Sequence, residues 1–431
     1  MRRYALIFPI VFAVILGGFA AFNALIDPYG VTGAPRLSGI NAVKTRLHAD
    51  GGRIHGADQM ARGTADSYLL GSSRVVDGFP NRPENWPGGI RNAGMRGTNM
   101  FELARAMTLA ARDPDLRCLV IGLDLDEFGT HGKTKASYAL SALSDGNRGM
   151  ALARMAMSPN TFAASVRTLA DNLAGQGEET PWQDAYDPGQ QRERYESGAR
   201  GTYRFYLGYR FDDERLRYFE AALDTLAARG VQVVAFIHPY HAWREEALFR
   251  AEQESSYFAL RRELADLFAH YETPNASVFL SPREAANPCV EGGPAMLWDF
   301  SGFQGFATRA APSPQATAPH ESFYEPSHYL PQIGQAMLDR MRGAPGSDTL
   351  FDEPFGLRLT PATARASEAE IRARRDHWLE TADGQDAAEF LDTVIAGRPS
   401  PESEPPQFLN RDDWQDLQRD LARLPDRAGA G

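Results

Sequence analysis

Residues 116–122 read Leu-Arg-Cys-Leu-Val-Ile-Gly, and they follow the helix-breaking pair Asp113-Pro114. A short run of aliphatic and β-branched residues after such a break is typical of a buried strand. Upstream, residues 101–111 carry apolar side chains at helical spacing, and residues 89–93 predict a short strand that ends before Gly94. Together these segments predict a strand-helix-strand unit.

The same alternation continues on both sides of this unit. Residues 67–70 predict a strand that stops at Gly71-Ser72-Ser73-Arg74, and residues 231–237 predict a buried strand after a helix that Gly230 closes. We also expect helices at 257–270 and 332–341 and a strand at 276–280. Continuous apolar strands separated by helices predict an α/β fold, in which helices cover both faces of a mostly parallel sheet.

The chain divides into three regions. Residues 1–30 predict a membrane anchor or signal segment, residues 31–343 the α/β domain, and residues 344–431 a helical extension with a Pro-rich linker. Between about 130 and 210 the pattern changes to helical pieces and polar turns, which predicts a helical cap inserted over the carboxyl edge of the sheet. In the extension we expect a charged helix, a linker and a short amphipathic helix at 361–380, 399–406 and 412–424.

The amino terminus has the composition of a membrane span. Residues 4–26 contain no charged side chain, and about 20 such residues cross a bilayer as a helix. Arg2 and Arg3 favour a cytoplasmic start, so we expect a single-pass inner-membrane protein with its C-terminal domain in the periplasm or otherwise outside the cytoplasm. A signal peptide cleaved after Gly18-Phe19-Ala20 and a buried soluble helix are the alternatives. No second run of this kind occurs, which excludes a multispanning transporter.

Composition narrows the function further. The 431 residues carry a formal net charge of −11, which makes general nucleic-acid binding an unfavourable function. The two cysteines are too few for a disulfide framework or a cysteine zinc cluster. We expect Cys118 to be a buried free thiol, and a single Cys118–Cys289 bridge is the alternative. No cofactor is implied.

Two short segments could together carry out nucleophilic chemistry. Ser73 lies on a glycine-led turn directly after a predicted strand, where ligands of open parallel sheets bind. Glu325 and His328 stand three residues apart on a turn that contains Pro326. The carboxylate could orient the imidazole while the other ring nitrogen serves as base for a serine. The structural alternatives are an ordinary turn at Ser73 with no catalytic role and a helix cap around His328.

This ordered set resembles the SGNH hydrolase family, also called GDSL-like lipases and acyl-esterases. Gly71-Ser72-Ser73 occupies the place of the family's Gly-Asp-Ser block, and Glu325-x-x-His328 the place of its closing Asp-x-x-His block. The resemblance implies a flavodoxin-like three-layer sandwich, with Ser73 as nucleophile, His328 as base and Glu325 as the orienting carboxylate. It also implies esterase or acyltransferase chemistry.

The resemblance further implies an oxyanion hole. Gly94 falls where the family's second block supplies a glycine, and Asn92 is a further candidate donor. The third block departs from the family pattern, because Asp124 stands where the family has asparagine. An ionised aspartate cannot donate a hydrogen bond, so Asn92 or backbone amides would have to replace that donor.

The chain also resembles membrane-anchored bacterial envelope proteins related to those that O-acetylate alginate or transfer D-alanine to teichoic acids. This resemblance covers residues 1 to about 343. It rests on the predicted anchor followed by four short motifs, at 27–30, 71–74, 298–301 and 325–329.

Six further residues are candidate substrate-binding groups: Arg74, Asp124, His238, His241, Trp298 and Asp299. Arg74 could bind an anionic acceptor or form a salt bridge with Asp77 or Glu325. The two histidines follow a predicted strand at its carboxyl edge, but zinc would need a third ligand there, so we expect no metal. Trp298-Asp299 could contact sugar or orient the catalytic turn, and a buried structural indole is the alternative.

These observations predict serine-dependent acyl transfer or ester hydrolysis on a cell-envelope glycan. The expected partners are the membrane, through the N-terminal helix, a glycan or acylated small-molecule substrate and an envelope-assembly partner that the sequence does not identify. Two alternatives remain: a non-catalytic glycan-binding or assembly protein of the envelope, and a membrane-tethered scaffold that keeps Ser73 and His328 far apart.

Overall fold

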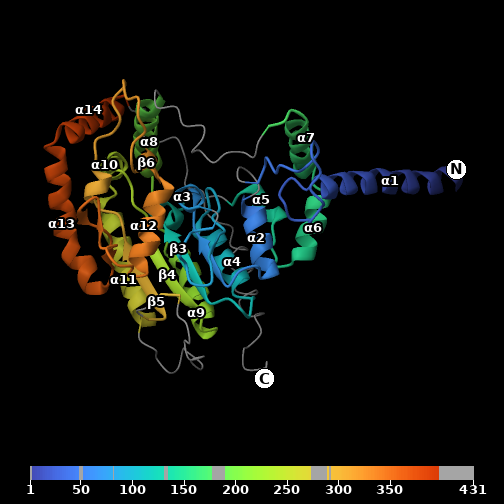
Figure 1. Ribbon diagram of the computed structural model, residues 1–431, viewed down its shortest axis with the longest axis horizontal. Helices are drawn as coiled ribbons and strands as arrows, with labels where there is room; N and C mark the ends of the chain where they lie inside the picture. Colours follow the sequence, from blue (N-terminus) through green and yellow to red (C-terminus); the bar gives the residue numbers. More distant parts are fainter. Residues whose placement is uncertain are drawn as a thin grey trace.

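The computed structural model describes residues 2–47, 52–80, 82–130, 134–176, 190–272, 289–290 and 293–397. Within these ranges a six-stranded sheet is flanked by helices, and one long apolar helix, α1 (Arg2–Ile26), projects from the body (Figure 1). The predicted α/β class with a mostly parallel sheet is confirmed. The strand expected at 276–280, the linker at 399–406 and the helix at 412–424 lie outside the described residues.

The sheet has the strand order β10-β5-β4-β3-β1-β2. Five strands are parallel, and β10 pairs antiparallel with β5 at one edge. The five parallel strands, β1 to β5, have the order of a doubly wound sheet, in which the winding reverses between β1 and β3. The bounds of the six strands are β1 (Ser67–Leu70), β2 (Arg91–Asn92), β3 (Cys118–Leu123), β4 (Gln232–Ile237), β5 (Ala295–Asp299) and β10 (Leu357–Arg358).

Helices pack in two groups against this sheet. α4 (Met100–Ala110) packs on α9 (Asp213–Ala228), and Phe219 of α9 contacts Phe268 of α11 (Glu254–Glu272). A second group is formed by α3 (Ser73–Gly78) and α12 (Pro331–Met341), which pack on each other. Right-handed crossovers put α3 and α4 on opposite faces, because the chain moves in opposite directions along the sheet at these two connections. Every residue of β1, β3 and β4 is buried, which explains their continuous apolar runs.

The helices between residues 134 and 206 fall into two places. α8 (Gln191–Tyr206) packs against α10 (Ala242–Arg250) and beside the carboxyl edge of the sheet. In contrast, α6 (Arg148–Ala156) and α7 (Pro159–Leu173) pack against α1, and α5 (Ala136–Leu140) packs on α2 (Gly52–Arg62) and α6. The segment predicted as one cap therefore also contacts the N-terminal helix.

The C-terminal helices α13 (Pro361–Leu379) and α14 (Ala382–Ala396) belong to the same body. α13 packs on α11, and α14 packs on α10 and α8 (Figure 1). Their side chains Ile371, Trp378 and Leu391 are buried within the main hydrophobic core. Together with β10, which completes the sheet, these contacts make residues 357–396 part of the α/β body. The short strands β8 (Thr349–Leu350) and β9 (Glu353–Pro354) form a hairpin before it.

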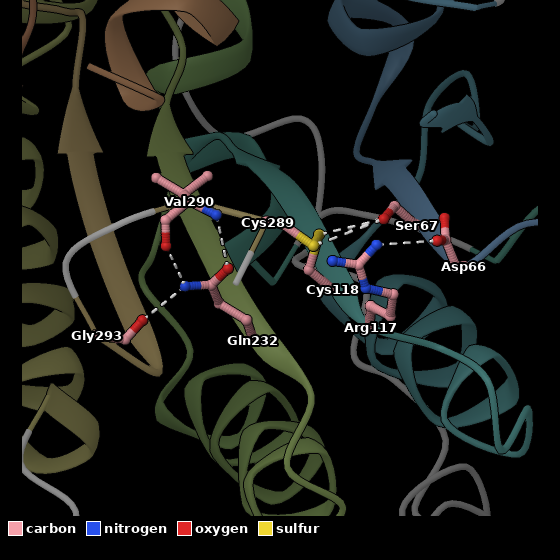
Figure 2. Close-up of a disulfide and its surroundings, with 8 residues drawn as sticks. All are labelled: Asp66, Ser67, Arg117, Cys118, Gln232, Cys289, Val290 and Gly293. Carbon is pink, nitrogen blue, oxygen red and sulfur yellow. Dashed lines mark hydrogen bonds and ion pairs between the residues drawn. A yellow bond between two sulfur atoms is a disulfide. The ribbon is translucent and has the colours of Figure 1, made fainter. Parts of the chain in front are cut away.

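Cys118 and Cys289 form a disulfide, so the expectation of a free buried thiol was wrong (Figure 2). Cys118 begins β3, and its Cα lies 6.4 Å from that of Cys289. Gln232 of β4 fixes the neighbouring residue, because its side chain accepts from Val290 N–H at 3.0 Å and donates to Val290 O at 2.7 Å. The disulfide lies at the amino end of the sheet, since Ser67 beside it begins β1.

Candidate active site

Ser73 lies at the carboxyl end of β1, where the order of the parallel strands reverses. β1 ends at Leu70, Ser72 caps α3, and Ser73 is the first residue of that helix. Gly71 makes this turn possible. Its φ is +149°, and a Cβ there would come within 2.6 Å of Val75 Cγ2. The reversal point of a doubly wound sheet is where ligands bind, so Ser73 has a suitable position for chemistry.

Glu325 and His328 face each other across a tight hairpin. β6 (Phe323–Glu325) and β7 (His328–Tyr329) pair antiparallel, with Glu325 opposite His328. His241 N–H donates to Pro326 O at 3.0 Å, which ties the turn to the start of α10. The hairpin therefore has a fixed position relative to the sheet.

The two segments meet at one hydrogen-bonded chain of side chains. Ser73 Oγ lies 2.8 Å from His328 Nε2, and His328 Nδ1 bonds to Glu325 Oε1. A carboxylate accepts from Nδ1–H, so Nε2 is the acceptor for the serine hydroxyl. This arrangement can remove the serine proton and hold the resulting imidazolium.

A close approach between α3 and β7 determines how near the serine is to the histidine. A Cβ on Gly78, the last residue of α3, would fall 2.1 Å from the Tyr329 ring. Tyr329 follows His328 directly and is completely buried. Any larger side chain at 78 would force the helix and the hairpin apart, so Gly78 indirectly positions both reacting groups.

Glu325 is held in its ionised form. Burial opposes its charge, but the charge and hydrogen bond of His328 outweigh burial and lower the pKa of Glu325. Ser327 N–H also donates to Glu325 Oε2 at 3.0 Å. The carboxylate is thus ready to stabilise a protonated His328.

The two candidate oxyanion residues on the β2 side bond to each other. Gly94 N–H donates to Asn92 Oδ1 at 3.0 Å, and Asn92 Nδ2 donates to Val75 O at 2.8 Å and Phe79 O at 3.2 Å. Asn92 is thus bonded to the backbone of α3 and of Phe79, and Gly94 N–H already has an acceptor. Ser73 N–H has no hydrogen-bond partner in the part of the chain that the structure describes, so it is the donor available to an oxyanion.

An ion pair beside the histidine was missed by the sequence reasoning. Asp77 Oδ2 lies 3.9 Å from His328 Nε2, and both carboxylate oxygens accept from Arg96, one of them at 2.6 Å. Asp77 follows Ser73 by one turn of α3, a spacing that would have singled it out. Arg96 gave no local signal, because its approach depends on the loop after β2. The pair brings a guanidinium to the rim of the site.

Arg74 and Asp124 lie in a buried charge network behind the reacting groups. Arg74 Nη1 bonds to Asp124 Oδ2 at 2.6 Å, and Arg74 Nε donates to Ser327 O at 3.1 Å. Among the described residues its ion-pair partners are Asp124 and Asp126, not the Asp77 or Glu325 that the sequence offered as alternatives, and its side chain is buried. Asp126 continues the network to Arg74 at 3.3 Å and to Arg244 at 2.9 Å.

Both carboxylate oxygens of Asp124 accept hydrogen bonds from buried side chains. Ser72 Oγ donates to Asp124 Oδ2 at 2.7 Å, and Tyr240 donates to Oδ1 at 2.5 Å. Burial opposes ionisation, but the charges of Arg74 and His238 outweigh it and lower the pKa of Asp124. Asp124 therefore joins the end of β3 to the Ser72 turn, and its side chain is completely buried. The substrate contact stays a prediction.

The two histidines after β4 are both buried. His238 Nδ1 lies 2.9 Å from Tyr329 Oη, which places it behind the hairpin. His241 caps α10 and bonds through Nε2 to Arg309 O at 2.7 Å. Burial lowers the pKa of each to about 4, so both are neutral at pH 7. Within the described residues, no group of three His, Cys, Asp or Glu side chains could hold a metal ion.

Trp298 and Asp299 are structural rather than near Ser73. Asp299 accepts from Arg261 Nε at 2.7 Å in a buried ion pair, and Arg340 lies over the Trp298 ring. Both residues belong to β5, whereas Ser73 follows β1, which is three strands away in the sheet.

A cavity of about 170 Å³ adjoins the Gly94 side of the site. Val76 of α3 and Gly94 form one wall, and Arg82, Arg91 and Gln59 also line it. Within the described residues neither guanidinium has an ion-pair partner, and the buried Gln59 Oε1 accepts no hydrogen bond. The cavity is therefore suited to a polar group that carries negative charge and hydroxyls.

Comparison with known proteins adds no assignment to this geometry, because no family model matches the chain and no curated protein matches it significantly.

Proposed function

We propose that the protein is a serine-dependent acyltransferase or esterase of the SGNH-like type that acts on a cell-envelope glycan. The single observation that carries the proposal is the hydrogen-bonded chain Ser73–His328–Glu325, with Ser73 Oγ 2.8 Å from His328 Nε2. The doubly wound strand order, with Ser73 at its reversal point, supports the same family.

In the proposed reaction His328 Nε2 takes the proton of Ser73 as Oγ attacks the carbonyl carbon of an acyl donor. The oxyanion of the tetrahedral intermediate accepts from Ser73 N–H, and Glu325 stabilises the imidazolium. The C–O bond to the leaving group then breaks, and the departing oxygen takes the proton from His328. Water or a sugar hydroxyl, deprotonated by His328, then attacks the carbonyl carbon of the acyl-serine. The bond from that carbon to Ser73 Oγ breaks, and Oγ takes the proton back from His328.

The inferred location of the α/β domain, at a membrane and outside the cytoplasm, supports an envelope substrate. α1 contains an apolar stretch, Ile7–Ile26, that is long enough to cross a membrane. Disulfides persist mainly outside the cytoplasm, so the Cys118–Cys289 bridge favours an extracytoplasmic domain, as the N-terminal arginines do. Retention of α1 is favoured by a contact made before the alternative cleavage site, since the ring of Phe19 stacks on Phe162 of α7 with centroids 4.9 Å apart.

The cavity beside Gly94 supports a polar, anionic acceptor or leaving group. Arg82 and Arg91 could pair with a carboxylate or phosphate, and Gln59 Oε1 could accept from a sugar hydroxyl. Since Val76 of α3 lines the cavity, this assignment places the glycan beside the helix that begins with Ser73.

Hydrolysis of p-nitrophenyl acetate by the purified full chain tests the proposal. Turnover above buffer that disappears in Ser73→Ala but persists in Ser72→Ala would support it, because Ser72 is the neighbouring hydroxyl and bonds to Asp124. Equal turnover in wild type and Ser73→Ala would refute the nucleophile assignment.

A non-catalytic glycan-binding protein is the second candidate. The occupied Gly94 N–H and the aspartate at 124 favour it, because both reduce the number of donors for an oxyanion. This alternative predicts no ester turnover by wild type, combined with glycan binding that Arg91→Gln weakens.

A further inference from the structure

The helix α7 has its polar and apolar faces reversed relative to a helix of a soluble protein. Its buried residues are small or polar, namely Thr161, Ala164, Ser165, Thr168 and Asn172. Phe162, Val166 and Leu173 point outward and are 38%, 45% and 72% exposed. A helix on a water-exposed surface normally buries its apolar side chains and exposes its polar ones. Asn160 and Arg167 are exposed as well, but the three large apolar side chains form a stripe on the outward face, and this stripe calls for an apolar environment.

The inward polar face has specific partners. Ser165 Oγ donates to Asn23 Oδ1 of α1 at 3.1 Å, and Asn23 Nδ2 donates to Ala156 O at 3.0 Å. Asn172 exchanges two hydrogen bonds with the backbone of Val43, at 2.8 and 3.0 Å. These bonds fix which side of α7 faces the protein, so its apolar stripe cannot turn inward without breaking them.

The neighbouring helix α6 also exposes apolar side chains. Met150 and Ala153 of α6 and its C-cap residue Met157 are exposed, whereas the buried residues of this helix are Ala151 and Met155. Leu37 and Ile40, in the loop after α1, are also exposed. Outside α1, the large exposed hydrophobic side chains of the described residues lie in three segments, namely α7, α6 with its C-cap and the loop after α1, and only Phe205 and Phe351 lie elsewhere. This concentration exceeds the scattered exposure that needs no explanation.

Both helices flank the part of α1 that lies next to the body. Figure 1 shows α6 and α7 on either side of the base of α1, running across its axis, and both contact it. Phe162 of α7 stacks on Phe19 of α1 with ring centroids 4.9 Å apart and contacts Phe22 at 5.3 Å. The apolar stripe of α7 thus begins on the surface of α1 itself.

The length of the span determines the depth of these contacts. The apolar stretch Ile7–Ile26 has 20 residues, and a bilayer core of about 30 Å needs roughly all of them at about 1.5 Å per residue. Phe19 lies roughly 10 Å along the helix before Ile26. A side chain that stacks on Phe19 must then lie below the outer surface of the hydrocarbon, at a depth typical of interfacial helices.

We propose that α6 and α7 are interfacial membrane helices, which lie in the outer leaflet beside α1 with their exposed apolar stripes in lipid. The bilayer is the occupant of this surface because the surface continues the span of α1. Lipid contact along three helices would hold the α/β body in a fixed orientation on the membrane, which a single flexible tether could not do. The inference rests on α1 crossing the bilayer, and it is independent of any chemistry at Ser73.

Nitroxide depth measurements on the full chain test this proposal. Single cysteines are introduced at Val166 and Leu173, with the native disulfide kept oxidised, and each variant is labelled and reconstituted in phosphatidylcholine–phosphatidylglycerol vesicles. Val11 in α1 serves as the immersed control, and Glu370 on the exposed surface of α13 as the aqueous control. All four side chains are exposed, so labels there disturb little packing.

We expect the labels at 166 and 173 to collide more often with oxygen than with a water-soluble nickel complex, as at 11, and the label at 370 to show the reverse. An aqueous signature at 166 and 173 with an immersed signature at 11 would overturn the proposal. Dipolar broadening at 166 with low access to both reagents would also overturn it, because a second copy of the chain would then cover the stripe. An aqueous signature at 11 would also overturn the proposal, because α1 would then not cross the bilayer.

Discussion

His328 Nε2 and Ser73 Oγ lie 2.8 Å apart, although 255 residues separate them in the chain. Two independent features bring them together: the turn after β1, which needs glycine at 71, and the β6–β7 hairpin, whose Tyr329 needs glycine at 78. Such a contact between a serine and a carboxylate-bound imidazole supports nucleophilic catalysis.

Removal of either reacting group should abolish turnover without unfolding the protein. We expect Ser73→Ala and His328→Gln each to lower kcat/KM for an activated ester by at least about a thousandfold, because neither can be replaced by the remaining groups. The thermal midpoint should change little, since both side chains lie at the rim of the site. Kinetics and circular dichroism on the same preparations check both statements.

Glu325→Gln should reduce turnover less than loss of the histidine does. Glutamine keeps the shape of the side chain but can present its amide to Nδ1, which favours the wrong tautomer and leaves the imidazolium without a counter-charge. We expect a loss of roughly 10²–10⁴-fold in kcat with little change in KM. A wild-type kcat in this variant would show that Glu325 serves the hairpin alone.

The Arg74–Asp124 pair should contribute strongly to stability. Asp124→Asn leaves Arg74 buried without its main counter-charge, which should lower the free energy of unfolding by about 3–5 kcal/mol. Adding Arg74→Met should restore part of this loss, because the unpaired charge is then gone. Urea unfolding of wild type, the two single variants and the double variant measures this double-mutant cycle.

The exposed pair Arg365–Asp266 is the matched control for that cycle. Asp266→Asn should cost less than about 1 kcal/mol, because water screens a surface pair. Equal losses from Asp124→Asn and Asp266→Asn would contradict the assigned role of the buried network.

Buried neutral histidines should make the protein sensitive to acid. Burial lowers the pKa of His241 to about 4, below its value in the unfolded chain, so the unfolded state binds more protons between these values. Stability from this residue is complete above about pH 6.5 and decreases as the pH falls toward 4, by roughly 3 kcal/mol in total.

His241→Asn should reduce that acid dependence while keeping a helix cap for α10, because asparagine is a good N-cap. The matched control is His377→Asn, since His377 is almost fully exposed. Urea unfolding at pH 7, 6, 5 and 4.5 gives the slopes. The same slope in His241→Asn and wild type would contradict the buried, neutral state of this ring.

Reduction of the disulfide should destabilise the amino end of the sheet. The bridge joins positions 171 residues apart, and its loss is expected to cost about 2–5 kcal/mol. Cys118→Ser with Cys289→Ser should therefore unfold at lower urea, while ester turnover at low temperature persists because Ser73 lies at the opposite end of β1. If the double variant loses ester turnover as well as stability to urea, the bridge also supports the site.

The strands and the central pair of side chains were predictable from local patterns. Residues 116–122 and 231–237 are apolar throughout because both faces of the sheet are covered, and they correspond to β3 and β4. Ser73 and His328 were identified because each lies on a turn whose glycine or proline fixes the backbone. Their juxtaposition followed from the rule that ligands gather at the carboxyl ends of strands.

Other features depend on contacts that no local pattern carries. Cys118 has the sequence context of a core thiol, and its bridge depends on where residue 289 returns to the sheet. Arg74 and Asp124 read as crevice residues because they follow strands, yet mutual attraction and Tyr240 hold them inside. The sequence of α7 does not show that its polar side faces inward, because that orientation depends on its contacts with α1.

The most direct test of the central claim is the site of covalent modification by an activated phosphonate ester, located by peptide mass spectrometry of the full chain. We expect one adduct, on Ser73, which is absent from His328→Gln and retained in Ser72→Ala. An adduct on another residue, or an unreactive Ser73 in a folded protein, would contradict it.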